Sequence, residues 1–339
     1  FMDFMDFMDP AKQEIFDFIV LRGCTNYYKI VDFDNSALST LSTQKNLFLQ
    51  KNSMSAKIHT FVTEYWKLDG GSCFGVIPKT IWSKISTPNE HNLINIASRC
   101  LLIESQDKKV IVDTGIGNKF DAKFYSYFFR TEIKSASTCV QELGFDRAEI
   151  TDVIFTHLHW DHIGGASFIN SRGEVELSFP NANHWCAKTG WEWAMNPSPR
   201  EKKAFFKADL LPILNSGKLK FIEHSGAFDE NIELSILNGH TIGQLIPTIQ
   251  TDFGTVVFSG DFIPSKAHIP IPYIPSQDIQ PLVSMKEKEA FFEQVADRDT
   301  TLIFQHDSDH ECCKLTNTAN GIQGTASFIW KTVGKIEQV

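Results

Sequence analysis

The chain lacks any apolar run long enough to cross a membrane. A spanning helix needs about 20 consecutive apolar residues, and polar or charged residues interrupt every apolar stretch of this 339-residue sequence sooner than that. The amino terminus also lacks the basic start, apolar centre and small-residue cleavage site of a signal peptide. We therefore expect no membrane association, and a cytoplasmic location is the default.

Basic charge is also scarce. The formal net charge is -9, whereas enzymes that act on nucleic acids carry a basic surface. This balance argues against a nucleic-acid partner. We expect a small-molecule substrate that is neutral or hydrophobic.

Paired cysteine motifs are missing. The chain has seven cysteines, an odd number, and no C-x-x-C spacing of the kind that binds zinc or forms a redox pair. We expect mainly reduced thiols. The adjacent Cys312 and Cys313 follow His306 closely, and we interpret them as ordinary side chains.

The length and a hydrophobic content of 42% are sufficient for a large core. We expect one domain over residues 59–339, preceded by an extension over residues 1–58. Residues 1–9 repeat Phe-Met-Asp three times and are interpreted as an artefact of expression or of the gene start. Two alternatives stay open for the extension: an arm across a partner subunit of a homodimer, or a helix packed on the surface.

The most informative motif lies between residues 157 and 162. His157, His159, Asp161 and His162 bring three imidazoles and a carboxylate into six positions, directly after the apolar and β-branched run 150–155. That run predicts a buried strand, and the loop that follows it predicts a metal site. A catalytic zinc ion usually has three protein ligands, so this loop alone does not complete two sites.

Further ligand types follow three other predicted strands. The apolar runs 232–237, 255–258 and 301–304 lead into His240, Asp261 and His306 respectively. Each of these residues alone is compatible with a surface loop. Their shared position after a strand favours metal ligands that meet in one site.

These four motifs, in this order, resemble the metallo-β-lactamase-fold hydrolases over about residues 60 to 310. Within them the chain is similar to the branch of N-acyl-homoserine-lactone lactonases and methyl-parathion-hydrolase-like enzymes. The resemblance implies an α/β (α+β) fold, a four-layer αβ/βα sandwich of two mixed sheets with the metals at one edge. Residues 68–78 resemble the first hairpin of that branch.

The resemblance also implies a division of the ligands. His157, His159 and His240 would bind one metal, Asp161, His162 and His306 would bind the other, and Asp261 would bridge the two. Asp113, in the stretch 110–117, would orient ligands without binding a metal. The alternative for Asp113 is an ordinary turn aspartate before Gly115.

Two adjacent divalent cations lower the pKa of a shared water toward neutrality. The resemblance therefore implies that a metal-bridging hydroxide attacks a lactone or ester carbonyl, with Asp161 or Asp261 as the catalytic group that passes a proton. Imidazoles and carboxylates without thiolates suit zinc, with manganese, iron and cobalt as alternatives. His159 is not replaced by the glutamate typical of the di-iron oxygen-reducing branch, which favours hydrolysis.

Two departures leave the substrate open. Gln244 stands where many lactonases have a second histidine, and Pro264 stands where some have a tyrosine that polarises the substrate carbonyl. Tyr273 either reaches the pocket or packs at its rim. The alternatives to a lactonase or esterase are a phosphotriesterase-like, thioester or β-lactam hydrolase and a non-catalytic metal-binding protein.

The remaining segments predict alternating strands and helices. We expect paired strands over 92–105 and 109–113, and helices over 124–143 and 285–296. The aromatic-rich insertion 179–206 either lines a substrate pocket or packs a cap onto the sandwich. His184 and His268 are expected to be structural.

Overall fold

The computed structural model describes residues 55–295, 298–319, 321–330 and 337–338. The predicted extension lies outside the described residues up to position 54. Everything described here belongs to one compact unit. Its first strand begins at Lys57.

The first sheet is mixed and has six strands. Its order is β1 (Lys57–Asp69), β2 (Leu93–Ser105), β3 (Lys108–Val112), β4 (Asp152–Ile154), β7 (Asn183–Ala187) and β8 (Leu219–Ile222). The first three strands pair antiparallel, and β3, β4, β7 and β8 pair parallel. The carboxyl ends of β3 and β4 therefore lie at the same edge.

The second sheet is also mixed. It contains β9 (Gly226–Ala227), β10 (Ile232–Leu237), β11 (Gln244–Thr251), β12 (Gly254–Phe258), β13 (Thr300–Ile303), β14 (Cys312–Thr318), β15 (Gly321–Gly324), β16 (Phe328–Ile329) and β17 (Glu337–Gln338). Strands β12 and β13 pair parallel, so their carboxyl ends also share an edge. A separate ribbon pairs β5 (Ser167–Ile169) with β6 (Val175–Leu177).

The helices of the described residues are short apart from one. They are α3 (Gly70–Phe74), α4 (Lys79–Trp82), α5 (Ala122–Ser126), α6 (Ala136–Glu142), α7 (Trp160–Ile163), α8 (Lys188–Met195), α9 (Lys207–Asn215) and the longer α10 (Pro281–Val295). No helix in this described part is long and apolar enough to span a membrane. The cytoplasmic location stays a prediction.

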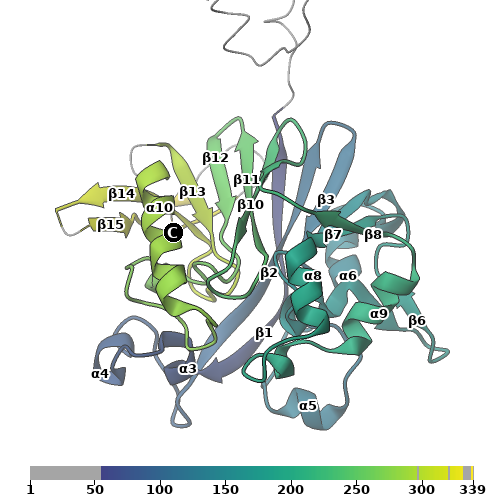
Figure 1. Ribbon diagram of the computed structural model, residues 1–339, viewed down its shortest axis with the longest axis horizontal. Helices are drawn as coiled ribbons and strands as arrows, with labels where there is room; N and C mark the ends of the chain where they lie inside the picture. Colours follow the sequence, from purple (N-terminus) through teal and green to yellow (C-terminus); the bar gives the residue numbers. More distant parts are fainter. Residues whose placement is uncertain (1–54, 296–297, 320, 331–336, 339) are drawn as a thin grey trace, which may run out of the picture. The chain divides into compact units, whose positions relative to one another are not determined.

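The two sheets face each other between two layers of helices. Ile103 and Val112 of the first sheet and Leu245 and Phe258 of the second belong to one buried cluster between the sheets. Each such side chain contributes about 1.5–3 kcal/mol by leaving water. Helices α6, α8 and α9 cover the outer face of the first sheet, and α10 covers that of the second (Figure 1). The predicted four-layer αβ/βα sandwich is confirmed.

Most predicted elements agree with the structure. The strand predicted over 232–237 coincides with β10, and the strands expected over 92–105, 109–113, 150–155, 255–258 and 301–304 match β2, β3, β4, β12 and β13 within a few residues. Helix α10 begins at Pro281, ahead of the predicted residue 285. Residues 68–78 contain the end of β1, which pairs antiparallel with β2, and α3, which begins the long connection between these two strands.

The single helix predicted over 124–143 is wrong. Helix α5 ends at Ser126 and α6 begins at Ala136. Between them Thr131 pairs with Tyr65 of β1 through backbone hydrogen bonds of 2.8 and 3.0 Å. Phe129 has a φ of 50°, which a continuous right-handed helix does not allow. Pairing with β1 therefore replaces local helix formation here.

Candidate metal centre

The loop 157–162 is fixed at its start by Thr156 and Asp113. The backbone N–H and the hydroxyl of Thr156 donate to the two carboxylate oxygens of Asp113 at 2.8 and 2.7 Å. After the loop, Gly165 packs so closely on the residues that follow β3 that a Cβ there would lie 2.0 Å from the carbonyl oxygen of Thr114. The loop is therefore held at both ends against the residues that follow β3. Position 165 requires glycine because any side chain there would clash with Thr114.

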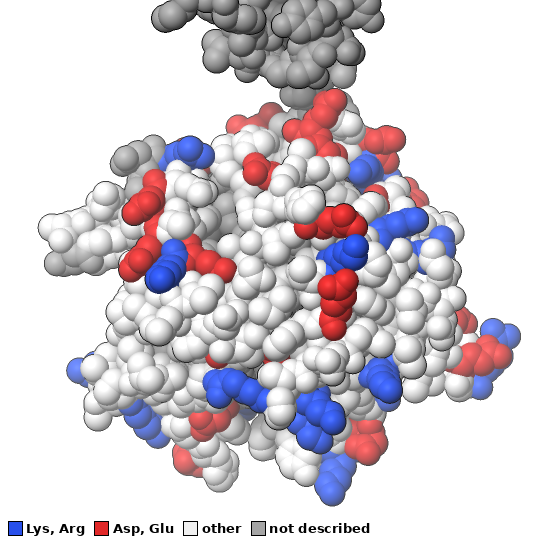
Figure 2. Space-filling view, viewed as in Figure 1, with Lys and Arg blue, Asp and Glu red and all other residues white. Residues whose placement is uncertain are grey.

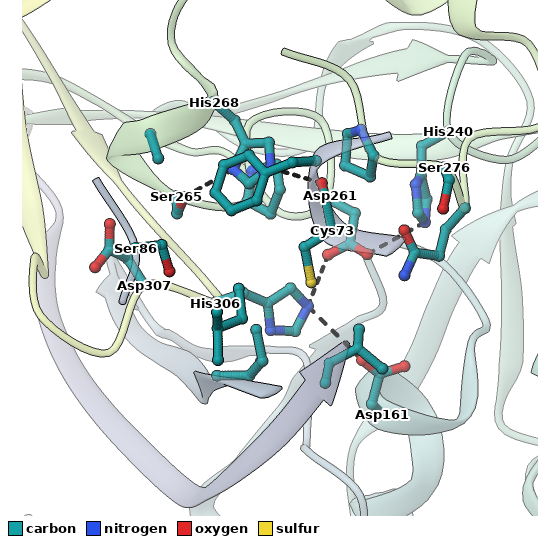
Figure 3. Close-up of a pocket in the computed structure, with 18 of the residues that line it drawn as sticks. Cys73, Ser86, Asp161, His240, Asp261, Ser265, His268, Ser276, His306 and Asp307 are labelled. Carbon is teal, nitrogen blue, oxygen red and sulfur yellow. Dashed lines mark hydrogen bonds and ion pairs between the residues drawn. The ribbon is translucent and has the colours of Figure 1, made fainter. Parts of the chain in front are cut away.

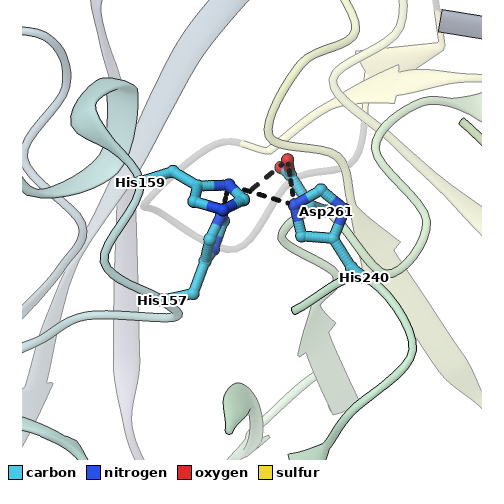
Figure 4. A group of neighbouring side chains, drawn as sticks. All are labelled: His157, His159, His240 and Asp261. Atoms are coloured by element: carbon cyan, nitrogen blue, oxygen red, sulfur yellow. Dashed lines mark hydrogen bonds and ion pairs between the residues drawn. The ribbon is translucent and has the colours of Figure 1, made fainter. Parts of the chain in front are cut away.

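Three histidines converge in a first group. Nε2 of His157 lies 2.9 Å from Nδ1 of His159, which lies 3.2 Å from Nε2 of His240 (Figure 4). Tetrahedral zinc with Zn–N bonds of about 2.0–2.1 Å places its nitrogen ligands about 3.3 Å apart. The group therefore has the spacing and the donor chemistry of a zinc site.

A second group lies beside the first. Nε2 of His162 and Nε2 of His306 are 3.3 Å apart, and Oδ2 of Asp161 lies 3.5 and 3.7 Å from them. Asp261 joins the two groups. Its Oδ2 lies 3.2 Å from Nε2 of His240, while its Oδ1 lies 2.8 Å from Nε2 of His306. The structure thus brings together all seven residues predicted as ligands, in two clusters.

The outward-facing nitrogens of four of these histidines have partners. The pairs are His159 Nε2 with Glu201 Oε1 at 2.7 Å, His240 Nδ1 with Asp278 Oδ1 at 2.8 Å, His162 Nδ1 with Asp113 Oδ2 at 3.0 Å, and His306 Nδ1 with the carbonyl oxygen of Ala97 at 2.8 Å. An imidazole that donates from one nitrogen keeps a lone pair on the other. Each inner nitrogen is therefore available to a metal.

Sequence reasoning missed Glu201 and Asp278. Glu201 lies in the insertion 179–206, and Asp278 lies in a Pro-rich stretch that precedes α10. Ser284 of α10 supports Asp278 with a hydrogen bond of 2.5 Å. The only signal in the sequence was an acidic residue within each segment. Their partners are distant in sequence and depend on the fold.

The charges of the site favour cations between the groups. Burial opposes ionisation of Asp261, but His306, His162 and His240 hold its pKa well below the usual range. Burial likewise opposes a charge on His240, yet Asp261 and Asp278 raise its pKa to about 9. The carboxylates thus attract positive charge into the positions where the lone pairs converge.

A cavity of about 930 Å³ opens onto the centre. Five of the seven predicted ligands line it, namely His159, Asp161, His240, Asp261 and His306, and Figure 3 shows Asp161, Asp261 and His306 facing one another there. Another part of the wall is aromatic, formed by Trp66, Phe74, Phe128, Trp160 and Tyr273. A small molecule with an apolar part can therefore reach the centre.

The aromatic side chains of the insertion do not line this cavity. Phe179, Trp191 and Phe205 are buried in the cluster between the first sheet and its helices, so the cap-packing alternative is confirmed for them. The residues of the insertion that line the cavity are Arg200, Glu201, Lys203 and Ala204.

On the face of the molecule drawn in Figure 2, acidic and basic side chains are interspersed.

The structure also shows the surroundings of the two histidines expected to be structural, of Tyr273 and of the cysteines. Burial lowers the pKa of His184 and of His268 to about 4, and neither belongs to the two ligand groups. Tyr273 lines the cavity and packs edge-on against Phe74. Pro264 also lines the cavity. The six cysteines within the described residues are free and buried, as expected for reduced thiols.

The fold and the paired clusters define a class of protein, the metal-dependent hydrolases built on an αβ/βα sandwich. The family model of the metallo-beta-lactamase superfamily matches residues 95–306. The chain therefore belongs to the metallo-beta-lactamase superfamily, and it is a metal-dependent hydrolase of that superfamily.

Relatives in sequence include lactonases. The chain is 23% identical over 230 residues to the N-acyl homoserine lactonase AiiA of Bacillus thuringiensis subsp. kurstaki, covering 65% of this chain and 84% of the relative. It is 25% identical over 244 residues to an N-acyl homoserine lactonase of Bacillus cereus, covering 68% and 89%. These values place lactonases among its relatives.

Solved structures agree on the fold. A probable metal-dependent hydrolase from Staphylococcus aureus superposes with a TM-score of 0.73 at 26% identity, over 82% of this chain and all of that one. The dizinc quorum-quenching lactonase AidC, in complex with a product, superposes with a TM-score of 0.65 at 20% identity, over 83% and 97%. The second likeness supports the sandwich alone.

Proposed function

We propose that the protein is a dinuclear-metal hydrolase that opens lactones or cleaves related esters, with zinc as the expected metal. One observation carries the proposal: Asp261 contacts histidines of two adjacent clusters and lines a cavity of about 930 Å³. Lactonases among the sequence relatives support the choice of substrate.

The chain's own residues have distinct roles in this proposal. His157, His159 and His240 would hold one cation, Asp161, His162 and His306 would hold the other, and Asp261 would contact both. When bound, such a pair supplies hydroxide near neutral pH and stabilises negative charge on the substrate oxygen. Asp113 would orient His162 through its Nδ1.

Asp161 is the better candidate for the proton carrier. Asp261 turns both carboxylate oxygens toward ligand histidines, at 2.8 and 3.2 Å. Asp161 turns Oδ2 toward His162 and His306 at the longer distances of 3.5 and 3.7 Å, and like Asp261 it lines the cavity. The Asp161 carboxylate is therefore held less closely by the histidines than that of Asp261, and it is the better placed of the two to pass a proton to a leaving oxygen.

The cavity wall supports a substrate with an apolar part. Trp160 packs against Phe128 with ring centroids 4.5 Å apart and against Trp66 at 5.7 Å. These rings offer apolar area beside Asp161 and exclude water from it. A neutral lactone or ester with an acyl or aromatic group fits this wall.

One observation favours a second candidate. Pro264 lines the cavity where some lactonases have the tyrosine that polarises a carbonyl, so this chain lacks that phenol at that position. A phosphotriester, thioester or β-lactam cleaved at the same centre is the alternative. The complete set of seven ligand residues argues against a non-catalytic metal-binding protein.

A substrate panel tests the proposal. Zinc- and manganese-reconstituted protein is assayed with acyl-homoserine lactones, simple lactones, an aryl phosphotriester, a thioester and a β-lactam. Fast lactone opening that disappears on chelation supports the proposal. A preference for the phosphotriester would replace it with the second candidate, and no hydrolysis with two metals bound would contradict both.

A further inference from the structure

Glu201 links a predicted metal ligand to the insertion that forms part of the cavity wall. Its Oε1 lies 2.7 Å from Nε2 of His159, and its Oε2 lies 2.6 Å from Nε1 of Trp193 in α8. The side chain is buried, with 5% of Glu201 exposed. Two partners therefore fix one carboxylate in a place that water scarcely reaches.

Both partners of Glu201 are hydrogen-bond donors. An indole Nε1 always donates. Nδ1 of His159 faces Nε2 of His157 and Nε2 of His240, so its lone pair is needed there and its proton sits on Nε2. A carboxylate accepts from both donors, whereas a glutamine amide turns its NH₂ toward one of them. The chemistry of the two partners therefore demands an acid at this position.

We propose that Glu201 is a positioning residue, which fixes the ring and tautomer of His159 for the first ligand group and couples that group to the wall of the substrate cavity. The inference rests on the proposed function and deepens it. It concerns one of the two ligand groups, because the second group has different supports. His162 contacts Asp113 directly after β3, and His306 contacts Ala97 on β2.

A contact between two segments of the cavity wall strengthens the coupling. The guanidinium of Arg200, next to Glu201, donates to the carbonyl oxygen of Ser276, and both residues line the cavity (Figure 3 labels Ser276). Two residues beyond Ser276, Asp278 accepts from His240. Arg200 thus connects two segments of the chain. One positions His159 through Glu201, and the other positions His240 through Asp278. Movement of either segment would displace a ligand of that group.

The test measures metal binding without substrate. Purified full-length protein is equilibrated with buffered zinc, and bound metal is counted by mass spectrometry. Glu201→Gln is expected to weaken one of two zinc positions by about 10- to 100-fold, the usual effect of losing such a partner, while the other keeps its affinity. The visible spectrum of the cobalt-loaded variant is expected to change for one ion. Glu192→Gln, which removes an exposed acid from α8, the helix that carries Trp193, is the matched control and is expected to bind like the wild type.

A second variant separates hydrogen bonding from loss of folding. Trp193→Phe removes the second donor, so in Glu201→Gln/Trp193→Phe the amide oxygen is free to accept from His159. The double variant is expected to recover most of the lost zinc affinity. Wild-type binding of both zinc ions by Glu201→Gln would overturn the proposal, as would a double variant that binds no better than Glu201→Gln.

The same measurement keeps the two proposals apart. A wild type that binds two zinc ions but hydrolyses nothing in the substrate panel would contradict the proposed function alone, because the Glu201 result is read from metal content. In an active enzyme, Glu201→Gln at saturating zinc is expected to lower kcat more than it raises KM. A rise in KM with an unchanged kcat would contradict a role in ligand geometry.

Discussion

Oδ1 of Asp261 lies 2.8 Å from Nε2 of His306. The opposite oxygen of the same carboxylate faces His240 at 3.2 Å, so one side chain at the end of β12 contacts both ligand groups. The other ligands of those groups reach it from three further strand ends, those of β4, β10 and β13, and from both sheets. A single carboxylate therefore joins the two halves of the sandwich at the proposed centre.

Replacing Asp261 by asparagine is expected to abolish turnover and leave the sandwich folded. Asparagine keeps the size of the side chain but removes the charge that both groups share. Activity is expected to fall by more than about 100-fold, beyond the usual effect of losing an orienting partner alone, together with loss of bound metal. Metal content, activity and melting temperature check this. Asp309→Asn, an exposed acid at the cavity wall, serves as the control; full activity in Asp261→Asn would contradict the assignment.

Asp113→Asn distinguishes an orienting role from a turn role. Asp113 has a φ of 59°, a conformation that asparagine also tolerates, so a simple turn residue would be replaced without loss. Its carboxylate, however, accepts from Thr156, His162 and Gln305, and an amide cannot accept from all of them. We expect a loss of about 1–3 kcal/mol in the free energy of unfolding and weaker metal binding, measured by denaturation and zinc titration. Wild-type values for both would establish the turn alternative.

Lys288 gives the stability a defined pH dependence. Its ammonium is fully buried and donates to the carbonyl oxygens of His268 and Pro270 at 2.5 and 2.8 Å. Burial lowers the pKa of Lys288 from 10.5 to about 7. Between pH 7 and about 10 the unfolded chain holds this proton and the folded chain has released it, so the free energy of unfolding rises with pH through this range.

Lys288→Met is the comparison for that prediction. The variant leaves the two carbonyl groups without their donor, which is expected to cost about 2 kcal/mol or more at pH 7. Unfolding by urea is measured for both proteins from pH 6.5 to 10. The wild type is expected to gain stability relative to the variant as pH rises above 7. A constant difference across the series would show that Lys288 does not titrate as stated.

The buried pair of Glu64 and Arg130 ties the segment between α5 and α6 to β1, beside the backbone pairing of Thr131 with Tyr65. The Arg130 guanidinium contacts the Glu64 carboxylate, with the side chains 6% and 1% exposed, and it also donates to the carbonyl oxygen of Gly117. Arg130→Met is expected to cost about 3–5 kcal/mol, because it leaves a buried carboxylate unpaired. Adding Glu64→Gln is expected to recover part of that loss. Equal stability of Arg130→Met and the wild type, in thermal or urea unfolding, would contradict this account.

The strands that precede the proposed ligands were predictable from the sequence. Residues 232–237 alternate apolar and polar side chains up to Ser235, whereas 301–304 is a short and largely apolar run. Both patterns are typical of strands with at least one buried face. The position of each proposed ligand directly after a strand was also visible in the sequence, and parallel neighbouring strands bring such positions to one edge. These features are local and are retained when the strands assemble.

Other parts depend on contacts between distant segments. The helix prediction over 124–143 failed because Thr131 pairs with Tyr65 of β1, an interaction that no local pattern reveals. Glu201 and Asp278 were missed for the same reason, since each becomes a partner of a ligand histidine only when its segment folds over the cavity. The aromatic residues of the insertion were compatible with either a pocket lining or a packed cap, and only the fold decides for the cap by placing Phe179 and Trp191 in the core.

The most direct test of the central claim combines metal content with lactone hydrolysis in one titration. Metal-free protein is loaded stepwise with zinc, and the rate of opening of an acyl-homoserine lactone is followed against the number of ions bound per chain. We expect activity to reach its maximum as the second ion binds and Asp261→Asn to stay inactive throughout. Full activity without bound metal, or in Asp261→Asn, would contradict the central claim.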